Sequence, residues 1–415
     1  MTRVPRPPFR LVPTTPVAAA GVLAVLAGLV LNEWTINALF NPIGLVPPDM
    51  ITVIRIFDVL CVVTGLGLMR WGRSLKGREI AFVAMMVAAF VILLEGGVRL
   101  SVWVRSLIVP ADRDFSVTLG WETRPHVRSE RAIPGYGRVR YSTTTHGFRA
   151  FGDVASPRTK VFVVGDSITQ AYTVSDGEAY FDHLARGRGD VELFVYGCGG
   201  YGTLQEYLIV DRYIDEIRPH LLLLQFSGTD IINNDHELES ASTVDNNQMV
   251  RPYLVGGTIA LRYPTQRRGA LGFIVQHSTL LRLLNIRLGF LRGDAEASVE
   301  HRLTADDPRF RRALATTAEI MAMVKKRAGA VPMVAFSADA GRDIYGDAFR
   351  AIAASQSLTT VDGVAEALEA AQAAGRVVDA APANTHWNRL GHAIVGEMLR
   401  DELVARGLIG RAPGR

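Results

Sequence analysis

Two short segments of the sequence contain residue types that can carry out a reaction together. In the first, the apolar run Lys160–Val164 continues directly into a Gly-Asp-Ser sequence that ends at Ser167. A strand that ends in this way projects the Ser167 hydroxyl beside backbone N–H groups, which can stabilise negative charge. In the second, His386 precedes the last predicted helix, 219 residues after Ser167. A histidine there can accept the serine proton as a general base and return it to a leaving group.

These segments and two others resemble the blocks of the SGNH, or GDSL-type, family of serine esterases and acyltransferases. The match is close at Gly165–Thr169, which reads GDSIT. The turn Gly197–Glu206 is similar to the second block of the family, which implies that the Gly200 N–H contributes to an oxyanion hole. In the third block, Thr229 stands where the family has an asparagine that also donates to the oxyanion. The resemblance extends over about residues 115–407 and implies ester hydrolysis or acyl transfer.

Two positions depart from the pattern of the family. The Thr229 hydroxyl is a donor, but it is shorter than an asparagine amide and free to rotate. Loss of one oxyanion donor outright costs about 10²–10³ in rate. The acidic residue that the family has three positions before the histidine is replaced by Ala383. Asp379 or Asn384 could orient the imidazole of His386 instead; otherwise the site is a Ser–His dyad.

The sequence predicts neither a metal ion nor a nucleotide cofactor. No group of His, Cys and Asp residues has metal-ligand spacing, and no phosphate-binding glycine motif follows a predicted strand. The two cysteines, Cys61 and Cys198, fall in an apolar N-terminal stretch and in the glycine turn. We therefore expect no disulfide between them.

An alternation of apolar runs and amphipathic segments must position these residues. Five runs are predicted as strands: Lys160–Val164, Glu192–Tyr196, His220–Phe226, Val331–Phe336 and Leu358–Val361. Five segments are predicted as helices: Gly177–Ala185, Leu204–Ile217, Pro308–Ala328, Gly363–Ala374 and Arg389–Arg406. This order predicts a three-layer α/β/α, flavodoxin-like fold with a parallel sheet. The ligand should then lie beyond the carboxyl ends of the strands.

The regions outside this alternation divide the chain further. Residues 105–150 predict a strand-containing segment that leads into the SGNH-type domain at 151–410. Residues 235–307 break the alternation and predict an inserted cap.

Three long apolar stretches occupy the N-terminal quarter. They are Val17–Phe40, Met50–Met69 and Ile80–Val104, of 24, 20 and 25 residues. As helices they would be about 30–38 Å long, which matches the hydrocarbon core of a bilayer. We therefore predict three transmembrane helices in residues 1–104. A buried bundle in a soluble domain, or a cleaved signal peptide at the first stretch, are the alternatives.

The basic residues around these stretches indicate an orientation. They precede the first stretch or lie between the second and third: Arg3, Arg6, Arg10, Arg70, Arg73, Lys76 and Arg78. Basic loops remain in the cytoplasm, so we predict a cytoplasmic N-terminus in the plasma (inner) membrane. After three crossings the C-terminal domain would be extracytoplasmic, or periplasmic, with the lipid bilayer as a partner of the chain.

Five charged residues fall within these stretches: Glu33, Arg55, Asp58, Glu95 and Arg99. Four of them form opposite-charge pairs at spacings of three or four, which lie on one helix face. Such pairing lowers the cost of inserting a charge, which is the interpretation we favour. The alternative is that these helices handle a lipid-linked or transported donor.

The distribution of charge argues against a nucleic-acid partner. The chain has 45 basic and 41 acidic residues, of which residues 1–104 contain nine and five, so the remainder contains 36 of each. A balanced domain has no overall positive field to attract a phosphate backbone.

Together these patterns predict a membrane-anchored, extracytoplasmic esterase or O-acyltransferase with a Ser–His mechanism. Its substrate would be an ester or an acylated glycan of the cell envelope, by compartment and by the resemblance to the family. The alternative is a catalytically impaired, glycan-binding or scaffold component of an export or O-acylation complex. Ala383 and Thr229 favour that alternative, and no protein partner is indicated by the sequence.

Overall fold

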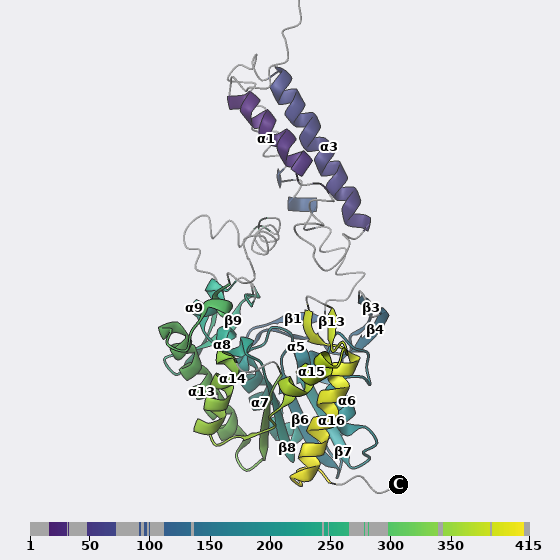
Figure 1. Ribbon diagram of the computed structural model, residues 1–415, viewed down its shortest axis with the longest axis vertical. Coiled ribbons are helices and arrows are strands. Elements are labelled where there is room, and N and C mark those ends of the chain that lie inside the picture. Colours follow the sequence, from purple (N-terminus) through teal and green to yellow (C-terminus); the bar gives the residue numbers. More distant parts are fainter. Residues whose placement is uncertain are drawn as a thin grey trace, which may run out of the picture. The chain divides into compact units, whose positions relative to one another are not determined.

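The computed structural model describes residues 16–30, 32, 48–71, 91–92, 95–97, 99, 112–133, 137–242, 245–247, 249–264, 278, 281, 298–338, 343–381 and 384–410. The chain divides into two compact units (Figure 1). The smaller unit is Met1–Val102 with Val275–Leu291. The larger unit is Trp103–Ile274 with Arg292–Arg415. The predicted cap therefore contributes one segment to the smaller unit.

The smaller unit contains two helices that pack closely. They are α1, Pro16–Val30, and α3, Pro48–Trp71. Glycines permit the close approach, since a Cβ on Gly65 would lie 2.5 Å from the carbonyl oxygen of Gly21. Among the described residues, no helix combines the length and the apolar character needed to span a bilayer.

Much of the predicted membrane region lies outside the described residues. This applies to Glu33, to the end of the first stretch and to most of the third stretch. In the described part of the third stretch, Arg99 Nε lies 2.6 Å from Glu95 Oε1. The hydroxyl of Ser278, from the cap segment, donates to Glu95 Oε2 at 2.8 Å.

The larger unit is built on a six-stranded sheet with the order β12-β11-β8-β6-β7-β5. The strands are β12 Thr359–Thr360, β11 Met333–Ser337, β8 Leu221–Phe226, β6 Thr159–Gly165, β7 Val191–Gly197 and β5 Ala150–Phe151. Five strands are parallel, but β5 runs antiparallel to β7 at the edge. The predicted α/β fold is thus confirmed, and the parallel sheet is corrected to a mixed one. A two-residue strand is too short to show a hydrophobic period in the sequence.

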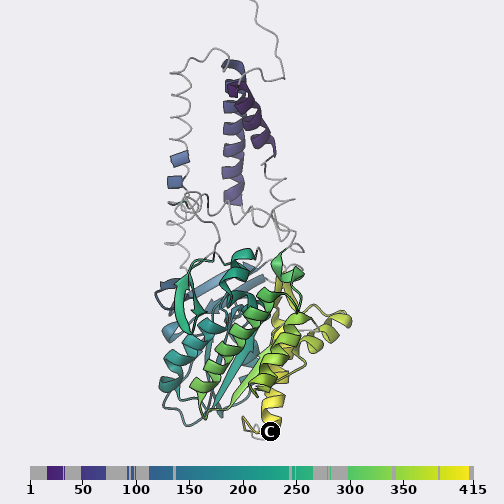
Figure 2. The same ribbon diagram turned by 90° about the vertical axis from the view of Figure 1, so that its left-hand side faces the viewer.

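Helices cover both faces of the sheet (Figures 1 and 2). On β6, Phe162 and Val164 face one hydrophobic core, and Val161 and Val163 face the other. The first core includes residues of α7 Thr203–Ile217, α13 Pro308–Ala328 and α14 Ile344–Ser355. The second includes residues of α6 Tyr180–Ala185, α15 Val364–Ala373 and α16 Arg389–Ala405. Because both faces are covered, the central strands β6 and β8 are mostly apolar.

Four hairpins and several short helices complete the described part of the larger unit. The hairpins are β1 Arg113–Ser116 with β2 Gly120–Thr123, β3 Arg128–Ile133 with β4 Gly137–Ser142, β9 Arg251–Val255 with β10 Thr258–Arg262, and β13 Asp379–Ala381 with β14 Asn384–Trp387. The short helices are η1 Thr145–Gly147, α5 Ser167–Gln170, α8 Thr229–Asn233, α9 His236–Ala241 and α12 Val299–Arg302. The hairpins β1–β2 and β3–β4 precede the main sheet in the chain, and α9 and β9–β10 lie in the predicted cap.

Candidate active site

The strand order brings three loops together at the carboxyl edge of the sheet. After β6 the chain forms β7 on one side of it and β8 on the other. This reversal of direction is the point at which α/β proteins place their ligands. Ser167 follows β6, Gly200 follows β7 and Thr229 follows β8.

The backbone around Ser167 is tightly held. The Asp166 carboxylate caps α5 by accepting from the Ile168 N–H at 2.8 Å, and the Asp166 N–H donates to Gln225 Oε1 at 3.1 Å. Gly165 leaves no room for a side chain, because a Cβ there would lie 2.4 Å from Gln225 Oε1. These contacts fix Ser167 as the first residue of α5.

His386 lies beside Ser167. Its Nε2 is 2.8 Å from the Ser167 Oγ, although the two residues are 219 positions apart. The strand β14, which carries His386, is held in place because Thr173 Oγ1 donates to the Trp387 carbonyl at 2.8 Å. The Tyr172 ring contacts the imidazole at a centroid distance of 5.0 Å. The fold thus brings together the hydroxyl and the imidazole that the sequence singled out.

The imidazole is in a low-dielectric environment that favours its neutral form. Burial lowers the pKa of His386 from 6.5 to about 4. A neutral imidazole at pH 7 can accept the Ser167 proton at Nε2. The proton on its other nitrogen would then be Nδ1–H.

Of the two residues predicted to orient His386, the structure describes the side chain of Asp379. The Asp379 carboxylate accepts from Gln372 Nε2 of α15 at 2.9 Å, and burial raises the pKa of this carboxyl group. The backbone of Asn384 lies in β14, opposite Ala381, but its side chain is outside the described part of the structure. Ala383 also lies outside it. The structure therefore shows the Asp379 carboxylate hydrogen-bonded to α15.

The glycine turn after β7 is tied to the helix that carries Ser167. The Gly199 N–H donates to Gln170 Oε1 of α5 at 2.9 Å. The Tyr201 N–H donates to the Cys198 carbonyl at 3.1 Å, which closes a turn with Gly200 at its third position. Gly200 has a φ of +78°, which side-chain-bearing residues rarely adopt. The glycine turn and α5, the helix that begins at Ser167, are therefore fixed relative to each other.

Thr229 begins α8 at the end of β8. Its hydroxyl donates to Ser227 Oγ at 3.2 Å. A role as an oxyanion donor would require this hydroxyl to rotate away from Ser227.

A fully buried acid, Glu206, lies in the first turn of α7. Burial, and then the charges of Asp230 and Asp166, raise the pKa of Glu206 well above its ordinary value. We therefore expect Glu206 to stay protonated to a higher pH than an exposed glutamic acid does.

The free energy of unfolding should depend on pH in a way that reveals the raised pKa of Glu206. A group whose pKa is raised on folding contributes stability below its unfolded pKa, and this contribution is lost as the pH rises toward the folded pKa. Relative to wild type, Glu206→Gln should therefore become more stable as the pH rises from 4.5 to 8. Urea unfolding at several pH values measures this difference, and a difference that does not change with pH would contradict a raised pKa.

Sequence reasoning missed the residues that hold the glycine turn, which come from β2, from α9, from the loop before β9 and from β9 itself. They are Trp121, Glu239, Asn247 and Arg251. Their contacts with the turn could not be read from the sequence, because they join positions 51 and 78 apart. The signal that the sequence offered was the presence of Glu239 and Arg251 in the inserted region, where Arg251 begins a mostly apolar strand.

No protein-family model and no curated protein sequence matches this chain. Several solved structures are similar to it. One is a member of the lipolytic protein G-D-S-L family from Veillonella parvula, with 12% identity, a TM-score of 0.34, and 60% of this chain and 98% of that chain covered. Another is the lipase/acylhydrolase from Enterococcus faecalis, with 14% identity, a TM-score of 0.35, and coverage of 60% and 96%.

A third is a catalytic mutant of an acetylxylan esterase from Geobacillus stearothermophilus, with 11% identity, a TM-score of 0.34, and coverage of 62% and 97%. The solved structures that this chain resembles thus include G-D-S-L lipolytic proteins and esterases. Similarity at this level assigns no activity, so the functional interpretation rests on the geometry of the site.

Proposed function

We propose that the larger unit is a serine esterase that uses Ser167 and His386. The observation that supports this proposal is the 2.8 Å distance between Ser167 Oγ and His386 Nε2. This distance is within hydrogen-bond reach for proton transfer, and burial keeps the imidazole neutral.

The reaction would proceed in two halves. Ser167 Oγ attacks the ester carbonyl carbon as His386 Nε2 takes its proton, and a tetrahedral oxyanion forms. The backbone N–H groups of Ser167 and Gly200, with the Thr229 hydroxyl, would stabilise this oxyanion. The C–O bond of the ester then breaks, and the leaving alcohol takes the proton from His386. Water, or a sugar hydroxyl as acceptor, would attack the acyl-enzyme by the same route in reverse.

We propose in addition that the N-terminal apolar stretches anchor the chain in the plasma membrane with the larger unit outside the cytoplasm. The lengths of these stretches and the position of the basic residues support this. A C-terminal alkaline phosphatase fusion should be active, and an inactive fusion that is expressed stably would contradict this topology. In that location, ester-linked acyl groups of envelope glycans, short ones such as acetyl, are the proposed substrates.

The esterase proposal is tested by labelling the full-length chain with a fluorophosphonate probe and by measuring turnover of p-nitrophenyl acetate. We expect one label per chain, on Ser167, and turnover above the rate with buffer alone. A folded protein that neither labels nor turns over the ester would contradict the proposal. It would favour the catalytically impaired, glycan-binding or scaffold function.

The pH dependence of kcat/KM should report the pKa of His386. Only the neutral imidazole can accept the Ser167 proton, so the rate is lost as the pH falls through the pKa, which burial lowers to about 4. We expect a half-maximal value near pH 4 and a plateau from there to neutral pH. Stopped-flow assays after a brief pH jump measure this profile, and a midpoint near the ordinary histidine pKa would contradict the environment described for His386.

A further inference from the structure

The peptide group between Gly199 and Gly200 carries the N–H that the proposed function assigns to the oxyanion. In a trans peptide the C=O and the N–H point in opposite directions. Whatever binds the Gly199 carbonyl therefore also sets the direction of the Gly200 N–H. Trp121 does this, because its Nε1–H donates to the Gly199 carbonyl at 3.2 Å.

The turn has an alternative conformation that would misdirect this N–H. The φ of +78° at Gly200 is the value that a type II turn requires at its third residue. In a type I turn the central peptide is rotated by about half a turn, so its N–H points to the opposite side. The Trp121 hydrogen bond is available only to the orientation that the structure contains.

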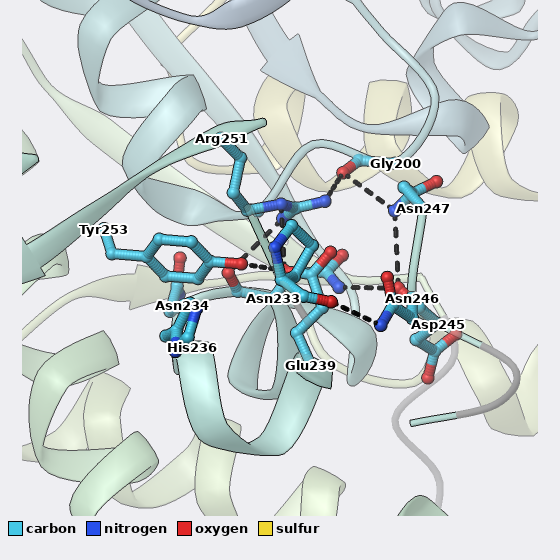
Figure 3. Close-up of polar contacts among 12 residues, drawn as sticks. Gly200, Asn233, Asn234, His236, Glu239, Asp245, Asn246, Asn247, Arg251 and Tyr253 are labelled. Atoms are coloured by element: carbon cyan, nitrogen blue, oxygen red, sulfur yellow. Dashed lines mark hydrogen bonds and ion pairs between the residues drawn. The ribbon is translucent and has the colours of Figure 1, made fainter. Parts of the chain in front are cut away.

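The carbonyl of the next peptide group is also held by side chains. Arg251 Nη2 donates to the Gly200 carbonyl at 2.5 Å, and Asn247 Nδ2 lies 3.5 Å from the same oxygen (Figure 3). The Arg251 guanidinium also lies over the Trp121 ring, 5.0 Å from its centroid. Trp121 and Arg251 thus contact each other as well as two successive carbonyl groups of the turn.

Glu239 holds Arg251 in place. Arg251 Nε lies 2.9 Å from Glu239 Oε2, and the side chains are only 1% and 0% exposed. Tyr253 donates its hydroxyl to the same carboxylate at 2.8 Å. Burial raises the pKa of Glu239 to about 7, against the opposing effect of the Arg251 charge. A buried ion pair of this kind adds little net stability, because desolvation offsets its attraction.

We propose that Trp121 and Arg251, with Glu239 behind them, are positioning residues that direct the Gly200 N–H toward the oxyanion. This inference rests on the proposed function of the larger unit. It assigns part of the inserted region 235–307 to the catalytic apparatus, because α9 supplies Glu239 and β9 supplies Arg251. It also assigns the β1–β2 hairpin to the catalytic apparatus, because β2 supplies Trp121.

The test measures kcat and KM separately for Trp121→Phe in the full-length chain. Phenylalanine keeps an aromatic ring under Arg251 but removes the N–H donor. We expect kcat to fall about 10- to 100-fold, somewhat less than removal of an oxyanion donor itself. KM and the pH midpoint of kcat/KM should stay unchanged, because neither substrate binding nor His386 is altered.

Two substitutions at Arg251 test whether a donor to the Gly200 carbonyl is what maintains kcat. Arg251→Lys keeps a cation that can donate to the Gly200 carbonyl, whereas Arg251→Met keeps similar volume and no donor. We expect Arg251→Lys to retain more of kcat than Arg251→Met. The control is Tyr213→Phe, which removes a hydroxyl from the hydrophobic core that also contains Trp121. We expect this variant to leave kcat unchanged.

The outcomes separate this inference from the proposed function. If wild type turns over the ester and Trp121→Phe has the same kcat, the positioning role is wrong and the esterase remains. A joint change of kcat, KM and pH midpoint in Trp121→Phe would indicate general loosening and also overturn the role. If wild type has no turnover at all, the proposed function itself fails, and the inference with it.

Discussion

Ser167→Ala should lower kcat/KM for p-nitrophenyl acetate by about 10³-fold or more and abolish fluorophosphonate labelling. The substitution removes the only atom that can form the acyl-enzyme in the proposed reaction, and losses of this size follow when a nucleophile is removed from a hydrogen-bonded pair. The oxyanion donors remain, so a small residual rate above that of buffer is compatible with the proposal.

The control for this prediction is Ser355→Ala. Ser355 lies at the end of α14, where its hydroxyl donates to the Ile352 carbonyl at 2.8 Å. We expect it to label and turn over like wild type. Equal activity in Ser167→Ala and wild type would eliminate Ser167 as the nucleophile, whatever the distance between its Oγ and His386.

His386→Ala should produce a second large loss, again of about 10³-fold or more in kcat/KM. The substitution removes the base that lies 2.8 Å from Ser167 Oγ. The loss should also depend differently on pH: the variant should lack the midpoint near pH 4, and its remaining rate should rise with hydroxide concentration.

His301→Gln is the matched control, because His301 is exposed in α12. We expect wild-type kcat/KM and an unchanged pH midpoint. A double variant of Ser167 and His386 that is no slower than either single variant would show that the two residues act as a unit. Losses that multiply would mean that they act independently, which contradicts the proposed mechanism.

The central part of the fold could be predicted from the sequence because its signals are local. All five predicted strands lie in the sheet, and the predicted helix Pro308–Ala328 has the bounds of α13. That helix begins at an Asp307 cap followed by Pro308 and ends before Gly329, which are the residues that favour these termini. Signals of this kind need no knowledge of the rest of the chain.

Elements whose formation depends on distant partners could not be predicted. The strand β5 has two residues and exists because β7 offers a free edge. The helix α14, Ile344–Ser355, was missed because its first turn contains an isoleucine, a tyrosine and a glycine, which are weaker helix formers. The Asp343 carboxylate caps this helix by accepting from the Tyr345 and Gly346 N–H groups. A single aspartate in the sequence was too weak a signal to predict a helix start there.

The candidate site divides in the same way. Ser167 and His386 lie at the ends of predictable elements, so the sequence identified the pair that the fold brings within 2.8 Å. Trp121 and Arg251 lie on hairpin strands, and they reach the glycine turn through contacts between positions far apart in the sequence. The sequence therefore indicated Ser167 and His386 but not the residues that hold the glycine turn beside them.

The division of the chain has a practical consequence for producing the larger unit alone. Because Ser278 of the inserted region donates to Glu95 of the smaller unit, deleting the first 102 residues would remove the acceptor of this hydroxyl. A version of the larger unit that is produced alone should therefore also replace residues 275–291 with a short polar linker.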